Sequence, residues 1–242
     1  MIKRRIIPCL LINDNILVKT VQFKNPKYVG DPIMAVKIFN DKEVDELIVI
    51  DISKNDNINF DLLTKLANQS FMPLTYGGHI KTMEDAKKIL NIGFEKICIN
   101  SVVLENKNII SDFAKAFGSQ SVVICINIKK DIFGKHCVYD TKTKKITNLD
   151  PCDYAASIEK LGAGEILLQS VDKDGLMKGF DIELITKISK TVSIPIIALG
   201  GAGNITDLEL ALQSGASAAA AGSLFVFYGP HKAVLINYNN NS

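Results

Sequence analysis

Three pairs of small residues in the second half of the chain have the composition of a phosphate-binding site. Each pair follows a short apolar run and precedes a segment of helical periodicity; the pairs are Asp174-Gly175, Gly200-Gly201 and Gly222-Ser223. Small residues before a helix leave backbone N–H groups exposed, and such groups bind anions. One pair could simply form a tight turn, but three coordinated pairs are less easily explained in that way. We therefore expect these loops to bind a phosphate group.

A related but incomplete set occurs in the first half of the chain. It consists of Gly77-Gly78-His79 and Asn100-Ser101. When the two glycine pairs are aligned, His79 stands opposite the small Ala202. The imidazole could close the site or donate a hydrogen bond to an anion, and a polar loop histidine is also often simply solvated. A second phosphate site at Gly78, His79, Asn100 and Ser101 therefore stays open.

The elements that must position these loops are eight short apolar runs, which alternate with longer segments of 3.6-residue periodicity. The runs are rich in Ile, Val, Leu and Ala, as strands covered on both faces should be; they span 5–11, 46–51, 72–76, 96–100, 121–128, 165–170, 194–199 and 217–221. Capping residues at Asp31-Pro32 and at Thr82 to Asp85 mark two helix starts. In a chain of 242 residues, this α/β order predicts one (β/α)8 TIM barrel with its strand-end loops on one face.

An internal repeat divides the predicted barrel into half-barrels at about 1–118 and 119–242. Ile50-Asp51 is matched by Val171-Asp172, and Ile99-Asn100-Ser101 by Ala221-Gly222-Ser223. This two-fold repeat predicts a ligand with two similar ends. The segment 129–150 departs from the repeat, and its lysine-rich sequence indicates a hairpin that overhangs the strand ends.

Composition narrows the function classes. A net charge of +2 offers no basic field of the kind that nucleic-acid binding needs. Five cysteines without paired spacing favour a reducing compartment, and we expect a cytoplasmic protein. Neither a signal sequence nor a membrane-spanning segment is indicated, and we expect neither a metal nor a cofactor.

At the level of longer motifs, the chain resembles the cyclase subunit of imidazole glycerol phosphate synthase, a HisF-like barrel of a glutamine amidotransferase in histidine biosynthesis. The resemblance runs nearly end to end; it is carried by RIIPCL at 5–10, ENKNII at 105–110, FGSQSVV at 117–123, GAGEILL at 162–168, DKDG at 172–175 and PIIALGGAGN at 195–204. It implies a HisH-like glutaminase partner that releases ammonia at the N-terminal face of the barrel. It also implies that ammonia passes through the barrel to a phosphorylated small molecule on the other face.

The sequence departs from this family where the cyclase reaction needs an acid and a base. The family uses two aspartates, at the ends of strands one and five, and the aligned residues here are Leu11 and Asn127. Neither side chain can exchange a proton at neutral pH, and each such transfer typically supplies about 10²- to 10⁴-fold in rate. Asp51 or Asp174 could take over, although catalysis is sensitive to misplacement of about 1 Å. The catalytic residues therefore stay unassigned.

The N-terminal end of the barrel matches the family more fully. Four charged residues that each precede an apolar run match the ring that gates ammonia entry; they are Arg5, Glu46, Lys96 and Glu165. Glu95 matches an acidic residue that docks the glutaminase, and Lys19 matches a substrate-contacting lysine in a flexible loop after strand one. Ion pairs at this end could also be purely structural.

The leading hypothesis is an ammonia channel and glutaminase-activating subunit that has lost its cyclase. Such chains resemble a branch found in bacterial surface-polysaccharide biosynthesis, where ammonia is supplied to a separate sugar amidotransferase that makes an acetamidino group. Two alternatives remain. One is the imidazole glycerol phosphate synthase cyclase of histidine biosynthesis, and the other is a stand-alone sugar-phosphate isomerase.

Overall fold

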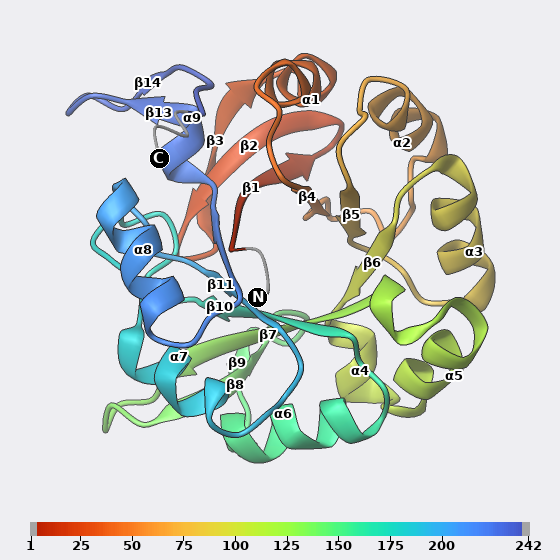
Figure 1. The fold of residues 1–242 in the computed structure, drawn as a ribbon, viewed down its shortest axis with the longest axis vertical. Coiled ribbons are helices and arrows are strands. Elements are labelled where there is room, and N and C mark those ends of the chain that lie inside the picture. The colour runs from red at the N-terminus through yellow and green to blue at the C-terminus, as the bar shows by residue number, and fades with distance from the viewer. Residues whose placement is uncertain (1–3, 239–242) are drawn as a thin grey trace.

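In the computed structural model, which describes residues 4–238, eight parallel strands form a closed barrel (Figure 1). They are β1 (Arg5–Asn13), β4 (Leu47–Asp51), β5 (Leu74–Gly77), β6 (Lys96–Ile99), β7 (Val122–Lys130), β10 (Glu165–Ser170), β11 (Ile196–Leu199) and β12 (Ala218–Ala221). Each strand pairs with the next, and β12 pairs with β1, which closes the circle. The predicted (β/α)8 barrel is confirmed.

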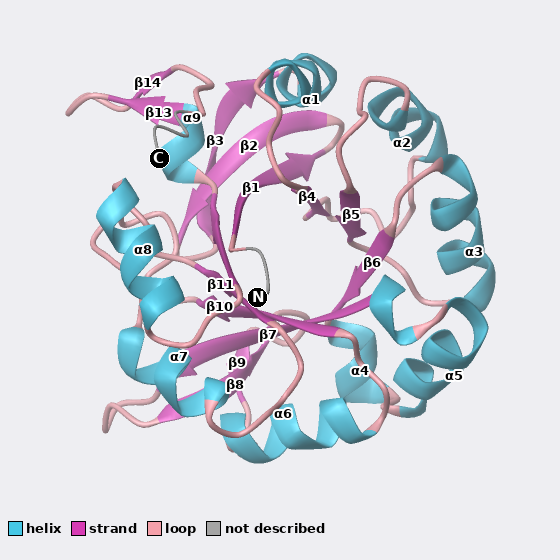
Figure 2. Ribbon diagram, in the orientation of Figure 1, coloured by secondary structure: helices cyan, strands magenta, loops and turns pink. Residues whose placement is uncertain are grey.

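Helices cover the outside of the barrel (Figure 2). They are α1 (Pro32–Asp41), α2 (Phe60–Ala67), α3 (Met83–Ile92), α4 (Ser101–Glu105), α5 (Asn108–Phe117), the 3₁₀ turn η1 (Ser119–Ser121), α6 (Pro151–Lys160), α7 (Ile182–Ser189), α8 (Ile205–Gln213) and α9 (Ser223–Val226). The predicted helix start at Asp31-Pro32 is confirmed, because the Asp31 side chain accepts a hydrogen bond from the Met34 amide. In the described part of the chain, no helix combines the length and the hydropathy that spanning a bilayer requires.

Three hairpins extend the barrel. The segment predicted as a hairpin forms β8 (His136–Asp140) and β9 (Lys145–Ile146) after β7, and a short pair, β13 (Phe227–Tyr228) and β14 (Ala233–Val234), lies near the C-terminus. The third consists of β2 (Ile16–Val21) and β3 (Lys24–Gly30). Here the prediction of a flexible loop around Lys19 is wrong, because Lys19 lies within β2 and pairs with Lys27 of β3.

Turn chemistry explains how the chain passes from β1 into β2, since Asn13 pairs with Ile16 and the two residues between them form the turn. Asp14 and Asn15 both have left-handed backbone angles, with φ of 50° and 67°. Asp and Asn tolerate this conformation, and two such residues in succession make the tight turn that joins antiparallel strands. The Asp14-Asn15 dipeptide between two apolar runs therefore indicates a hairpin turn.

The core has two layers. The larger one fills the space between the strands and the helices, and the smaller one fills the inside of the barrel. Inward-facing side chains of the smaller layer include three cysteines and two alanines: Cys9, Cys98, Cys125, Ala218 and Ala220. All five cysteines of the chain are free thiols.

The half-barrel repeat is visible in the helix caps. Thr82 and Asp85 form a capping box at the start of α3, and Asn204 and Asp207 form the same box at α8, 122 residues later. The strands before them, β5 and β11, begin at the same offset. This offset aligns His79 with Gly201, and both have positive φ, 58° and 119°. The alignment of His79 with Ala202 is therefore wrong by one residue.

The capping boxes give a stability prediction. Thr82→Ala and Asn204→Ala should each lower the free energy of unfolding by about 1 kcal/mol, since each leaves helix amides without an acceptor. Urea unfolding followed by circular dichroism measures this change. Thr64→Ala is the matched control: its hydroxyl bonds only the Phe60 carbonyl within α2, so a loss within about 0.5 kcal/mol is expected. Equal losses at all three positions would contradict the assignment.

Candidate functional site

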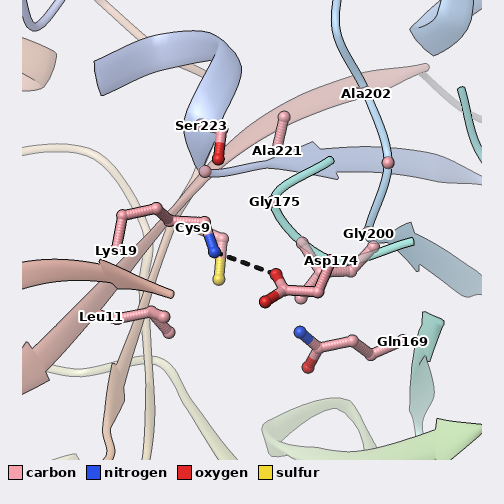
Figure 3. A pocket seen from close by; sticks show the side chains of 13 residues that line it. Cys9, Leu11, Lys19, Gln169, Asp174, Gly175, Gly200, Ala202, Ala221 and Ser223 are labelled. Carbon is pink, nitrogen blue, oxygen red and sulfur yellow. Dashed lines mark hydrogen bonds and ion pairs between the residues drawn. The ribbon is translucent and has the colours of Figure 1, made fainter. Parts of the chain in front are cut away.

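A pocket opens at the C-terminal ends of the strands in the second half of the barrel (Figure 3). All six small or acidic residues predicted to bind phosphate line it, and they share it with Lys19 and Leu11; the six are Asp174, Gly175, Gly200, Gly201, Gly222 and Ser223. The loops after β10, β11 and β12 therefore meet as predicted. Sequence analysis missed Cys9 and Gln169, which also line the pocket. Gln169 is a polar residue that directly follows the apolar run Ile166–Leu168 of β10, and that was its available signal.

Close backbone packing explains the glycines of this pocket. A Cβ atom on Gly201 would lie 2.2 Å from the Gly179 carbonyl oxygen, and one on Gly175 would lie 2.4 Å from the Thr20 carbonyl oxygen. Both glycines also have positive φ, a region that larger residues rarely adopt. The walls of the pocket are consequently formed in part by backbone, as an anion-binding loop requires.

The charge in this pocket is a buried ion pair. Lys19 Nζ lies 2.9 Å from Asp174 Oδ1 and also donates to the Thr20 carbonyl, while Thr20 Oγ1 donates to Asp174 Oδ2 at 3.1 Å. Lys19 is 7% exposed and Asp174 4%. The Gln22 amide donates to the Asp174 carbonyl as well, so these contacts hold the β2–β3 hairpin against the loop after β10. Asp174 thus positions Lys19, which is the cation of the pocket.

Leu11 and Asn127, which the sequence resemblance aligned with an acid and a base, occupy equivalent places in the half-barrels, because Leu11 is paired with Ile50 of β4 and Asn127 with Gln169 of β10. Leu11 lines the pocket, whereas Asn127 is buried and accepts a hydrogen bond from Cys125 Sγ at 3.4 Å. Cys9 lines the pocket together with Leu11. Burial raises the pKa of the Cys9 thiol to about 12, so this thiol is protonated at neutral pH. Among the residues that line the pocket, Cys9 therefore carries its proton, and Lys19 and Asp174 are engaged with each other.

The first-half residues have different surroundings. His79 Nδ1 lies 3.4 Å from Asp56 Oδ1, and His79 Nε2 lies 3.7 Å from Asp51 Oδ1. The Asp51 carboxylate, followed by Asp56, raises the pKa of His79 against the opposing effect of burial. Burial would raise the pKa of Asp51, but the nearby His79 imidazole and the hydrogen bonds from Ser53 outweigh it and hold that pKa below its usual range. Two carboxylates, those of Asp51 and Asp56, thus lie beside His79, where the sequence left a second phosphate site open.

Asn100 and Ser101 are also engaged by the protein itself. The Asn100 amide donates to the Cys125 carbonyl, and Ser101 Oγ lies 3.1 Å from Thr141 Oγ1 in the turn between β8 and β9. Gly78 packs against the end of β4, since a Cβ there would lie 2.6 Å from the Asp51 carbonyl oxygen. The first-half residues therefore contact acidic groups and the β8–β9 hairpin.

At the opposite end of the barrel, four charged side chains alternate in a ring. Arg5 contacts Glu46 at 2.7 Å and Glu165 at 2.5 Å, and Lys96 contacts the same two carboxylates at 3.1 and 2.8 Å. Thr75 Oγ1 donates a further hydrogen bond to Glu46. Both glutamates are buried. Beside the ring, Glu95 is exposed.

Together these features define a class: a (β/α)8 barrel of two half-barrels, with a glycine-walled pocket at the strand ends and an ion-paired ring at the other end. The family model described as "Histidine biosynthesis protein" matches residues 5–231. The chain belongs to this family, among its HisF-like imidazole glycerol phosphate synthase subunits, and the resemblance found in the sequence is confirmed at this level.

Individual relatives match over almost their whole length. A Pseudomonas aeruginosa protein, provisionally named imidazole glycerol phosphate synthase subunit hisF2, is 50% identical over 98% of this chain and 96% of its own length. A Vibrio vulnificus protein, provisionally named subunit hisF3, is 46% identical over 100% and 95% of the two chains. Subunit HisF of Alkaliphilus metalliredigens, named without that qualification, is 42% identical over 93% and 91%.

The surroundings of His79 give a pH prediction. Because the folded-state pKa of His79 is raised, its contribution to stability is fully present below the unfolded pKa of about 6.5 and is lost as pH rises through the folded value. The stability difference between wild type and His79→Asn should therefore shrink with rising pH, as urea unfolding can measure. In Asp51→Asn, an NMR titration should show a lower pKa for His79. An unchanged value would contradict the role of Asp51.

The charged ring predicts a second effect. Lys96→Met leaves Glu46 and Glu165 sharing Arg5 alone, so the free energy of unfolding at pH 7 should fall by about 3–5 kcal/mol. Guanidinium unfolding of wild type and variant at pH 7 measures it. Lys88→Met, which removes an exposed pair with Glu84, should change stability little; a similar loss in both variants would contradict the prediction.

Proposed function

We propose that this chain is the HisF-like subunit of a glutamine amidotransferase in which it conducts ammonia and activates a glutaminase, and that it does not close an imidazole ring. One observation carries the proposal: the two equivalent positions that would hold the acid and the base are Leu11 and Asn127. Neither can exchange a proton at neutral pH. The protonated Cys9 and the Lys19–Asp174 pair beside Leu11 offer no ready substitute.

The ring at the N-terminal end supports the ammonia part of the proposal. Arg5 and Lys96 each contact both Glu46 and Glu165. If one of the two cationic side chains rotates away, each carboxylate therefore still contacts the other cation. Lys96 is the simpler gate, because its compact ammonium is on a flexible stem. Above the ring, the apolar interior favours neutral ammonia over the ammonium ion, since burying an unpaired charge is costly.

The strand-end pocket supports delivery to a phosphorylated acceptor. Its glycine walls and Lys19 suit one anionic group, whereas Asp51 and Asp56 disfavour a second one at His79. A ligand with one phosphate end fits this asymmetry better than the ligand with two similar ends that the repeat predicted.

The remaining roles come from the resemblance. A HisH-like glutaminase would dock on the N-terminal face near Glu95, and a sugar amidotransferase of surface-polysaccharide biosynthesis would accept the ammonia. The complex would act in the cytoplasm.

The alternative is the cyclase of histidine biosynthesis. It is favoured by similarity to proteins named imidazole glycerol phosphate synthase subunit HisF, such as those of Alkaliphilus metalliredigens and Streptococcus sanguinis, which are 42% and 41% identical. It requires that groups other than Leu11 and Asn127 move the protons. No specific observation favours a stand-alone isomerase.

The proposal predicts that this chain raises glutamine hydrolysis by its glutaminase about 10- to 100-fold, a usual range for coupling between sites. The measurement is glutamate release by the glutaminase with and without the chain. Glu95→Lys should weaken the association about 10-fold, because it reverses a charge at the docking face. Glu209→Lys, on the exposed side of α8, is the matched control and should leave it unchanged.

A histidine auxotroph that lacks its own cyclase subunit separates the two functions. The proposal expects no growth when this chain is supplied together with the glutaminase. Vigorous growth would establish the cyclase, and an absence of both stimulation and association would exclude the activating role.

A further inference from the structure

The turn between β7 and β8 holds two large apolar side chains out in solvent. Ile132 is 92% exposed and Phe133 87%. The turn is well fixed: Asp131 Oδ1 accepts hydrogen bonds from the Phe133 and Lys135 amides, both at 2.9 Å, and the Gly134 amide donates to the Asp131 carbonyl at 3.1 Å. The two side chains are therefore held in solvent by a defined turn. Exposing adjacent large apolar side chains does not stabilise a monomer, and such patches often mark interaction sites.

A pocket of about 100 Å³ lies directly beside this turn, between its C-terminal end and helices α6 and α7. Pro151, Leu184 and Ile188 give it a buried apolar wall. An apolar cavity of about 150 Å³ accommodates benzene, so this smaller pocket has room for part of one apolar side chain. Gly134 and Lys135, which follow the exposed side chains in this turn, line the pocket themselves.

We propose that two copies of this chain associate through this side, with Phe133 of each copy inserted into the pocket of the other. A two-fold symmetric interface requires that one patch carry both a projection and its complementary hollow, and here Gly134 and Lys135 belong to both.

The charges around the pocket support a second copy as the occupant. Two lysines, Lys135 and Lys187, and two acids, Asp150 and Glu183, are among the residues that line it, so the patch offers both signs of charge to a second copy of itself. A membrane surface or a nucleic acid would instead favour a rim of uniformly positive charge. The patch is separate from the strand-end pocket and from the charged ring, so this inference does not depend on the proposed function.

Sedimentation velocity of the purified chain between 1 and 100 µM, as rough working limits for a dimer of moderate affinity, tests the proposal. Wild type should shift from monomer to dimer across this range. Phe133→Asp should weaken the dimer about 1,000-fold, because an interfacial anchor is lost twice in a symmetric pair. Phe71→Asp is the matched control: Phe71 is 95% exposed in the segment before β5, and its replacement should leave dimerisation unchanged.

Cys152 supplies a second measurement that places the interface. It lines the pocket and is half-buried, whereas the other four cysteines are buried. Its reaction with a bulky maleimide should slow about 10-fold or more as wild type dimerises, because the pocket would then be filled in most molecules at 100 µM. In Phe133→Asp the reaction should not slow. A wild type that stays monomeric at 100 µM would overturn the proposal, as would a dimer that leaves Cys152 equally reactive or that survives Phe133→Asp.

Discussion

The alternating ring of Arg5, Glu46, Lys96 and Glu165 is the interaction on which the rest of the barrel depends. Its members come from β1, β6, β10 and the residue before β4, and each carboxylate is shared between two cations. A buried carboxylate without its partners is strongly destabilising, so the ring fixes where these strands start relative to one another. With the starts of these strands fixed at this end, the loops at the other end can differ without disturbing the closure of the barrel.

Those upper loops show how two copies of one motif have diverged. The half-barrels retain the same capping box and the same left-handed residue after the third strand of each half, but this residue is Gly201 in one and His79 in the other. Glycine leaves the backbone bare for a ligand, whereas the imidazole lies between Asp51 and Asp56. The exchange at this conformationally equivalent position, together with Asp51 and Asp56, thus gives the two corners different charge surroundings.

The sequence predicted much of this structure because most of its signals are local. All eight barrel strands lie within two residues of their predicted bounds, since strand-length apolar runs and helix caps are set by neighbouring residues. The misplacement of Lys19 has a local cause too, because the turn at Asp14 and Asn15 was not recognised. The alignment of His79 depended on backbone angles: the consecutive left-handed residues are Gly78 and His79 in one half and Gly200 and Gly201 in the other. Residue types alone did not show this. The Lys19–Asp174 pair joins residues 155 positions apart, and no periodicity reveals such a contact.

On the proposed function, the absence of a titratable side chain at Leu11 and Asn127 is chemically compatible with an ammonia path. Closing an imidazole ring requires protons to move between substrate atoms at defined positions, which is why a misplaced or missing acid or base is so costly. Neutral ammonia, in contrast, is already a nucleophile when it arrives, and an apolar interior selects for that form because ammonium is poorly solvated there. A subunit that only delivers ammonia therefore needs a gate, a dry interior and a place to seat the acceptor. On the proposed function, Leu11 removes a charge from the exit of that path, and Asn127 keeps the hydrogen bond with Cys125 without adding a charge of its own.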